Sequence, residues 1–186
     1  RTSNDSPIVG ALKEAAELGK SVTAVIELKA RFDEATNATW ARTLERAGVH
    51  VVYGVVGLKT HAKCVLVVRS DADGLRRYVH FGTGNYNSKT ARIYEDIGFL
   101  TCDPAMGEDA TQLFNHLTGY SRAHDYNSLI VAPHGLRSRL LQFIANEATY
   151  GSDGHITIKT NSIGDPEVIE ALYAASQAGV RIDLLV

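Results

Sequence analysis

Apolar residues recur along this chain at two different spacings, which together predict alternating helices and strands. Apolar positions three or four residues apart predict helices at 7–18, 33–47, 107–121, 136–144 and 165–178. Short apolar runs rich in β-branched residues predict strands at 21–28, 49–55, 57–68, 77–81, 94–101, 128–132, 155–159 and 180–186. Such alternation is typical of an α/β fold.

The strand at 57–68 differs from the others because it begins with polar residues. His61 and Lys63 stand at its entrance, ahead of an apolar run that starts at Cys64. Side chains alternate along a strand, so both should point to the same face. An imidazole beside an ammonium group at this place favours chemistry on an anion. The alternative is an exposed histidine and a solvated lysine, since so short a pattern recurs by accident.

A glycine-rich segment follows the strand at 77–81, which turn-forming residues 70–74 should join to the preceding strand as a hairpin. Two glycines there flank Thr83, and glycine lets successive backbone amides approach a phosphate closely. The alternative is an ordinary Gly-Asn turn. Further donors and positive charge in this segment come from Asn85, Asn87 and Lys89.

Length and charge limit the classes of function. The chain has 186 residues, of which 45% are hydrophobic, enough for one domain of ordinary size or one domain and part of another. A net charge of -2 offers no general attraction for nucleic acid, so any anion site must be local. No apolar run approaches the roughly 18 residues that a membrane span needs.

Cysteine use fits a reducing cytoplasm. Two cysteines, Cys64 and Cys102, do not make the disulfide framework of a small secreted protein. Cys64 should point to the opposite face of its strand from His61. We therefore predict that Cys64 is a buried structural thiol and not a nucleophile.

The end of the chain resembles its beginning. An offset of 160 residues places Asp165, Leu172 and Gly179 on Asp5, Leu12 and Gly19, each time in the order Asp, helix, Gly, strand. Any helix followed by a strand shares part of this pattern, so chance resemblance is one explanation. The other is duplication, with a first domain at 1–127 and a truncated second domain at 128–186. A counterpart of His61 would then fall beyond the end of the chain.

His61-Ala62-Lys63 followed by Gly82-Thr83-Gly84-Asn85 resembles the phospholipase D superfamily. The resemblance implies a mixed sheet flanked by helices, a histidine that attacks phosphorus, and two half-sites facing each other across a pseudo-twofold axis. Two departures stand out. Val68 occupies the place of the superfamily's acidic residue, and Thr83 replaces the serine of its loop.

Several longer blocks resemble the carboxy-terminal half of bacterial polyphosphate kinases. They lie at 25–34, 48–54, 57–63, 78–87 and 89–96, with Arg-x-x-x-Asp-Ser at the start of the chain. The resemblance implies reversible transfer of the ATP terminal phosphate to inorganic polyphosphate through a phosphohistidine. The alternatives are a phospholipase D-like phosphodiesterase or nuclease and a non-catalytic polyanion-binding domain.

The same resemblance assigns roles to individual residues. His61 would be the phosphorylated nucleophile, and Lys63 would offset charge on the transferring group. Tyr94 matches a nucleotide-contacting tyrosine, and the loop residues named above would assist in nucleotide binding. Arg1 and Arg31 match arginines of the magnesium-phosphate site. A guanidinium cannot ligate a cation, so both are expected to bind phosphate oxygens that also hold Mg²⁺.

Further expectations concern neighbouring residues. Glu27 and Asp33 flank Arg31 and either orient it or are plain surface acids. His80 lies on the strand expected to pair with that of His61. A metal site there would lack cysteine or carboxylate companions, so we do not expect one.

Partners and location follow from the resemblance as well. It implies ATP or ADP and polyphosphate as substrates, Mg²⁺ as cofactor, and a homo-oligomer for the full-length enzyme. The expected location is the cytoplasm, including the membrane periphery for the full-length enzyme. An isolated fragment is expected to be inactive because the facing half-site is absent.

Overall fold

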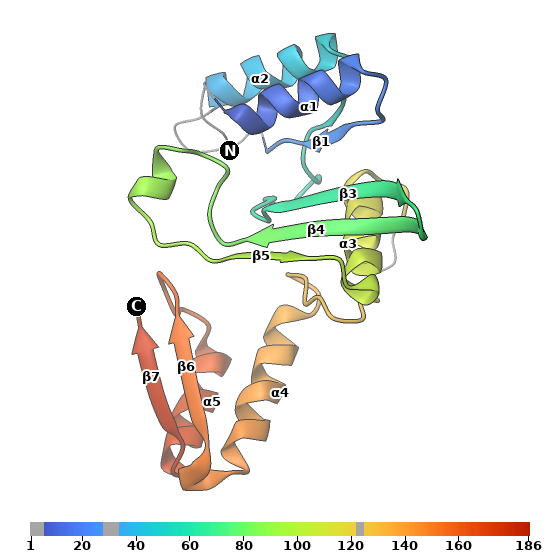
Figure 1. Cartoon of the computed structure of the whole chain (residues 1–186). Coiled ribbons are helices and arrows are strands. Elements are labelled where there is room, and N and C mark those ends of the chain that lie inside the picture. Colours follow the sequence, from blue (N-terminus) through green and yellow to red (C-terminus); the bar gives the residue numbers. More distant parts are fainter. Residues whose placement is uncertain (1–5, 28–33, 122–124) are drawn as a thin grey trace. The chain divides into compact units, whose positions relative to one another are not determined.

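Helices and strands alternate along the chain in a computed structural model that describes residues 6–27, 34–121 and 125–186 (Figure 1). The α/β class expected from the sequence is therefore confirmed. The chain divides into two compact units, Arg1–Ser128 and Leu129–Val186.

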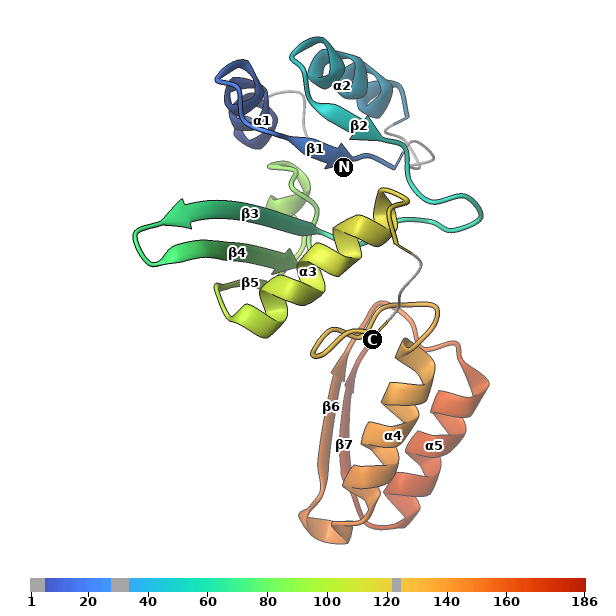
Figure 2. The same cartoon turned by 90° about the vertical axis from the view of Figure 1, so that its right-hand side faces the viewer.

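The first unit begins with two helices packed on two parallel strands. The elements are α1 (Pro7–Glu17), β1 (Thr23–Val25), α2 (Glu34–Arg46) and β2 (His50–Val52). The two helices lie side by side, as both views show (Figures 1 and 2). Val9, Leu44 and Val49 are buried where the helices meet the strands. The paired part of each strand is three residues long, shorter than the apolar runs had predicted.

An antiparallel sheet follows in the same unit. Its strands are β3 (Cys64–Asp71), β4 (Gly74–Gly82) and β5 (Gly98–Thr101), in that order across the sheet, with the short helix η1 (Thr90–Arg92) before β5. The predicted hairpin is confirmed, because β3 and β4 pair without interruption from Cys64 and Phe81 to Asp71 and Gly74.

Helix α3 (Pro104–Leu117) covers one face of this sheet (Figure 2). Val79 of β4 is 1% exposed beneath it, together with the buried Ala110 and Leu113 of the helix. Gly107 allows close approach, since an added Cβ would lie 2.8 Å from the Cβ of Arg77. The helix begins three residues earlier than predicted. The Asp103 side chain accepts a hydrogen bond from the Met106 amide at 3.0 Å, and proline occupies the first helical position.

The strand predicted at 128–132 is wrong, because this segment has no strand structure. The backbone amides at its start bind a buried carboxylate instead of a neighbouring strand. Asp109 of α3, which is 0% exposed, accepts hydrogen bonds from the Asn127 amide at 2.8 Å and the Ser128 amide at 2.7 Å. The Asn127 side chain adds a third bond at 3.1 Å.

The second unit repeats the combination of two helices and two parallel strands. The elements are α4 (Leu136–Ala148), the short helix η2 (Gly151–Asp153), β6 (His155–Lys159), α5 (Pro166–Gln177) and β7 (Arg181–Leu185). Ile144, Leu172, Ala175 and Val180 form its buried core. The strand predicted at 155–159 is confirmed with the same bounds.

The internal repeat has a different offset from the one that the sequence suggested. Both units run helix, strand, helix, strand, and a glycine with positive φ precedes the last strand of each, Gly48 at 87° and Gly179 at 101°. The offset between these glycines is 131 residues. It places the buried Leu172, Ala175 and Val180 on the buried Ala41, Leu44 and Val49. Four elements correspond in this alignment, whereas the offset of 160 relates only two.

No helix in the described part of the chain is both long enough and apolar enough to cross a membrane.

Removing the Asp109 carboxylate should destabilise the first unit. In Asp109→Ala the amides of Asn127 and Ser128 lose their acceptor in a buried place, which should cost about 3 kcal/mol of unfolding free energy. Urea unfolding followed by circular dichroism measures the change. The control is Glu108→Ala, an exposed position on the same helix, which should change the free energy by less than about 0.5 kcal/mol. Equal effects of the two substitutions would contradict this role for Asp109.

The two cysteines should differ in reactivity. Burial raises the pKa of the Cys64 thiol to about 11, so only about one molecule in a thousand carries the thiolate at pH 8. Cys102 is exposed. Iodoacetamide at pH 8 should therefore modify Cys102 and spare Cys64, as measured by peptide mass spectrometry, and both should react in denaturant. Modification of Cys64 at the rate of Cys102 in the folded protein would refute the prediction.

Candidate active site

His61 and Lys63 lie in the segment just ahead of β3 and not inside the strand. The ladder nevertheless reaches them, because the Gly82 amide donates to the Lys63 carbonyl oxygen at 3.0 Å. This bond extends the β3–β4 pairing by one position beyond Cys64 and Phe81. The strand pairing therefore fixes where the histidine-lysine pair begins and brings it next to the glycine-rich loop.

The two side chains expected to act together are in contact. The Lys63 ammonium nitrogen lies 3.1 Å from Nδ1 and 3.2 Å from Nε2 of His61, and it donates to the His61 carbonyl oxygen at 2.6 Å. The His61 ring is exposed, while Lys63 is half-buried. An imidazole that solvent can reach, with a held ammonium beside it, suits attack on a phosphate whose negative charge the lysine offsets.

The glycine-rich loop folds against the segment before β5. The Thr83 amide donates to the Ile97 carbonyl oxygen at 3.0 Å, and the Ile97 amide donates to the Thr83 hydroxyl at 2.9 Å. The carboxylate of Asp96 lies against Gly84, where any added Cβ would collide with it. The Thr83 amide thus has a protein partner in this structure, as in the turn that was the alternative to a phosphate loop. The collision explains why glycine is needed at position 84.

The other loop residues differ in how they are held. The Asn87 side-chain oxygen accepts the amides of Lys89 at 3.0 Å and Thr90 at 3.3 Å, so it stabilises the turn into η1. Asn85 is half-buried and the Lys89 side chain is exposed. Tyr94 lies after η1 and not in a strand, and it is 66% exposed.

A histidine and a tyrosine that the sequence did not connect lie on the same sheet face as Lys63. His80 pairs with Val65, and because side chains alternate, Lys63, Val65 and His80 share the face that α3 does not cover. The Tyr86 hydroxyl lies 2.7 Å from Nδ1 of His80. Burial raises the pKa of Tyr86 to about 12, so its hydroxyl stays protonated and can donate to the ring.

Two glycines make room for the His80 ring. An added Cβ on Gly98 would lie 2.9 Å from its Nε2, and one on Gly82 would lie 3.1 Å from its Cε1. Gly82 and Gly98 are directly paired between β4 and β5. A histidine flanked by paired glycines is visible only once the register is known, which is why the sequence gave no such signal.

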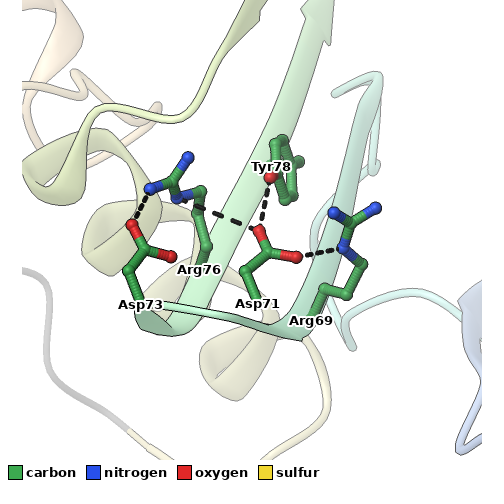
Figure 3. A network of polar contacts seen from close by, with 5 residues as sticks. All are labelled: Arg69, Asp71, Asp73, Arg76 and Tyr78. Carbon is green, nitrogen blue, oxygen red and sulfur yellow. Dashed lines mark hydrogen bonds and ion pairs between the residues drawn. The ribbon is translucent and has the colours of Figure 1, made fainter.

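Charged residues gather at the other end of the same hairpin, but with both signs (Figure 3). Asp71 accepts a hydrogen bond from the Tyr78 hydroxyl at 2.6 Å and pairs with Arg69. Arg76 pairs with Asp73. The hydrogen bonds from Tyr78 and Arg69 hold the pKa of Asp71 below its usual value. This end of the hairpin is therefore an internally balanced network and not a patch of unpaired cations.

The site also includes an acidic residue at the end of β1. The Thr60 amide, next to His61 in the chain, donates to Oε2 of Glu27 at 2.9 Å. The Glu27 backbone oxygen accepts a hydrogen bond from the Asn37 side chain at 2.9 Å. The sequence had linked Glu27 only with Arg31.

Three residues expected near the site, Arg1, Arg31 and Asp33, lie outside the described residues. Within the ranges that the structure describes, no three histidine, cysteine, aspartate or glutamate side chains gather closely enough to hold a metal ion.

Comparison with known proteins gives the family of the chain. Residues 1–123 match the family model "Polyphosphate kinase C-terminal domain 1", and residues 129–186 match "Polyphosphate kinase C-terminal domain 2". The chain is 60% identical over 189 residues to a polyphosphate kinase of Synechocystis sp. and 57% identical over 193 residues to one of Mycobacterium marinum. All of this chain is covered in both alignments, which span 26% of each relative.

A solved structure agrees. The crystal structure of polyphosphate kinase from Porphyromonas gingivalis matches 99% of this chain and 31% of its own, with a TM-score of 0.84 and 36% sequence identity. The chain thus spans about a quarter of the length of its curated relatives. Together with the two family models, these similarities show that the chain belongs to the polyphosphate kinase family.

Proposed function

We propose that the protein containing this chain transfers the terminal phosphate of ATP reversibly to inorganic polyphosphate, with His61 as the phosphorylated residue. The observation that carries the proposal is the contact of an exposed His61 ring with the Lys63 ammonium at 3.1 Å. It lies in a chain that two polyphosphate kinase family models cover almost completely.

The chemistry proceeds in two displacements. The lone pair of a neutral His61 ring nitrogen attacks the γ-phosphorus of ATP, the bond from that phosphorus to the bridging oxygen breaks, and ADP leaves. A terminal oxygen of polyphosphate then attacks the same phosphorus, the N–P bond breaks, and the imidazole is restored. Lys63 stays beside the ring and stabilises charge on the equatorial oxygens. Asn85, Asn87, Lys89 and Tyr94 are the residues proposed to bind the nucleotide.

Magnesium is the cofactor that this reaction implies, where it would neutralise charge on the phosphate oxygens. The described residues offer no cluster of carboxylates or histidines for it. Such a donor set fits a cation carried mainly by ATP and polyphosphate. Arg1 and Arg31, which lie outside the described residues, are proposed to bind phosphate oxygens of the same complex.

We extend the proposal to the arrangement of domains. The two units are interpreted as related phospholipase D-like domains, at 1–127 and 128–186, whose facing half-sites complete one active centre. The repeated order of elements and the superposed buried positions support this interpretation. With the offset of 131 residues, the counterpart of His61 would be at about position 192, so the 186 residues alone should be inactive.

The first test is phosphate labelling of the full-length protein. Incubation with γ-labelled ATP should give an acid-labile, base-stable label on His61, and His61→Ala should reduce labelling by more than about 1,000-fold because the nucleophile is gone. His50→Ala, an exposed histidine on β2, is the control and should label normally. Label that survives His61→Ala would disprove the proposed intermediate. Hydrolysis of a chromogenic phosphodiester would favour the phosphodiesterase alternative, and unlabelled binding of polyphosphate a binding domain.

The second test is removal of magnesium. Chelation with EDTA should reduce labelling of His61 by more than about 100-fold, and added Mg²⁺ should restore it. Mg²⁺ without nucleotide should change the Tm of the protein by less than about 1 °C, because a cation held through phosphate oxygens has little affinity for the protein alone. A large stabilisation by Mg²⁺ alone would instead reveal a protein-built metal site.

A further inference from the structure

Three segments of the first unit meet at one side chain, Glu27, just beyond the end of β1. Its carboxylate accepts the Thr60 amide at 2.9 Å. Its backbone oxygen accepts a hydrogen bond at 2.9 Å from Asn37 of α2, a side chain that is only 2% exposed. Glu27 is thus fixed from the α2 side and holds the chain that leads into β3.

The shape of this chain explains why an anchor is needed there. After β2 it turns at Gly54, whose φ is 60°, and a short bridge between Val55 and Leu58 closes an exposed excursion. Gly54 lies close to the anchor, since an added Cβ would be 3.6 Å from Oε2 of Glu27 and 3.8 Å from the Thr60 hydroxyl. The returning chain therefore meets Glu27 at the residue before His61.

His61 lies between two fixed points. On one side the Thr60 amide is bound to Glu27, and on the other the Lys63 carbonyl is bound to the Gly82 amide at 3.0 Å. Phosphoryl transfer depends on positioning, and a displacement of about 1 Å at the reacting atom can cost about 100-fold in rate. A loop that is exposed at its tip cannot hold an imidazole to that tolerance without such anchors.

We propose that Glu27 is a positioning residue, whose carboxylate holds the Thr60 amide and thereby places the His61 ring for attack on phosphorus. The inference rests on the proposed role of His61. It differs from the two expectations from the sequence, an orienting partner of Arg31 and a plain surface acid, because the atom that matters is an acceptor oxygen at a given reach and not a negative charge.

Two substitutions separate reach from charge. Glu27→Gln keeps an acceptor oxygen at the same distance along the side chain and removes the charge. Glu27→Asp keeps the charge and withdraws the oxygen by one methylene, about 1.5 Å. The matched controls are Glu14→Gln and Glu14→Asp, at an exposed position of α1.

The experiment measures two quantities in the full-length protein. The first is the rate of phosphate incorporation at His61 as a function of ATP concentration, and the second is hydrogen exchange in the peptide that contains Thr60. In Glu27→Gln, both should stay within about twofold of the unsubstituted protein. In Glu27→Asp, the maximal rate should fall about 10-fold or more while KM for ATP stays within about twofold, and the Thr60 amide should lose protection. The Glu14 variants should change neither.

Several outcomes would overturn the inference. Full labelling and unchanged Thr60 protection in Glu27→Asp would show that the anchor is dispensable. Loss of labelling in Glu27→Gln with activity retained in Glu27→Asp would show that the charge matters. If Glu27→Asp did not fold, Glu27→Gln would decide alone, since its loss of labelling contradicts the inference and its retention supports it. Unsubstituted protein labelled elsewhere than at His61 would instead refute the proposed function.

Discussion

The pairing of β3 with β4 is the constraint on which the candidate site depends. It continues past the strand ends to the bond between the Gly82 amide and the Lys63 carbonyl, so two segments twenty residues apart in sequence are fixed side by side. The histidine-lysine pair and the glycine-rich loop are neighbours for this reason. Burial of Val79 under α3 holds the hairpin to the rest of the unit, and a register shift of one residue would send that valine to the other face.

Charge is distributed unevenly along the uncovered face of this hairpin. Near the turn, Arg69 and Arg76 are matched by Asp71 and Asp73, and Tyr78 completes the network. At the opposite end, the ammonium of Lys63 is held beside an exposed imidazole. Anion chemistry is therefore expected at the end that carries Lys63. The network near the turn acts instead on the geometry of the hairpin.

Much of the architecture could be predicted from local patterns. The helix that ends at Gly19, the hairpin at 70–74 and the strand at 155–159 each follow from spacing, turn residues or β-branched runs. The strand predicted at 128–132 failed because its amides bind Asp109, nineteen residues away, and no local pattern records such a bond. The repeat was likewise misaligned from sequence, since its offset is recognisable only when the buried positions of the two cores are known.

The sequence by itself determined the α/β class, the candidate pair His61 and Lys63 and the family resemblance, because these depend on residue types at short, fixed spacings. Only the tertiary structure decided which groups surround that pair. The contact of Glu27 with the Thr60 amide spans 33 residues, and the place of His80 between two glycines depends on strand register. Hydrogen-bond partners of this kind are chosen by the path of the backbone in three dimensions, which spacing along the chain does not encode.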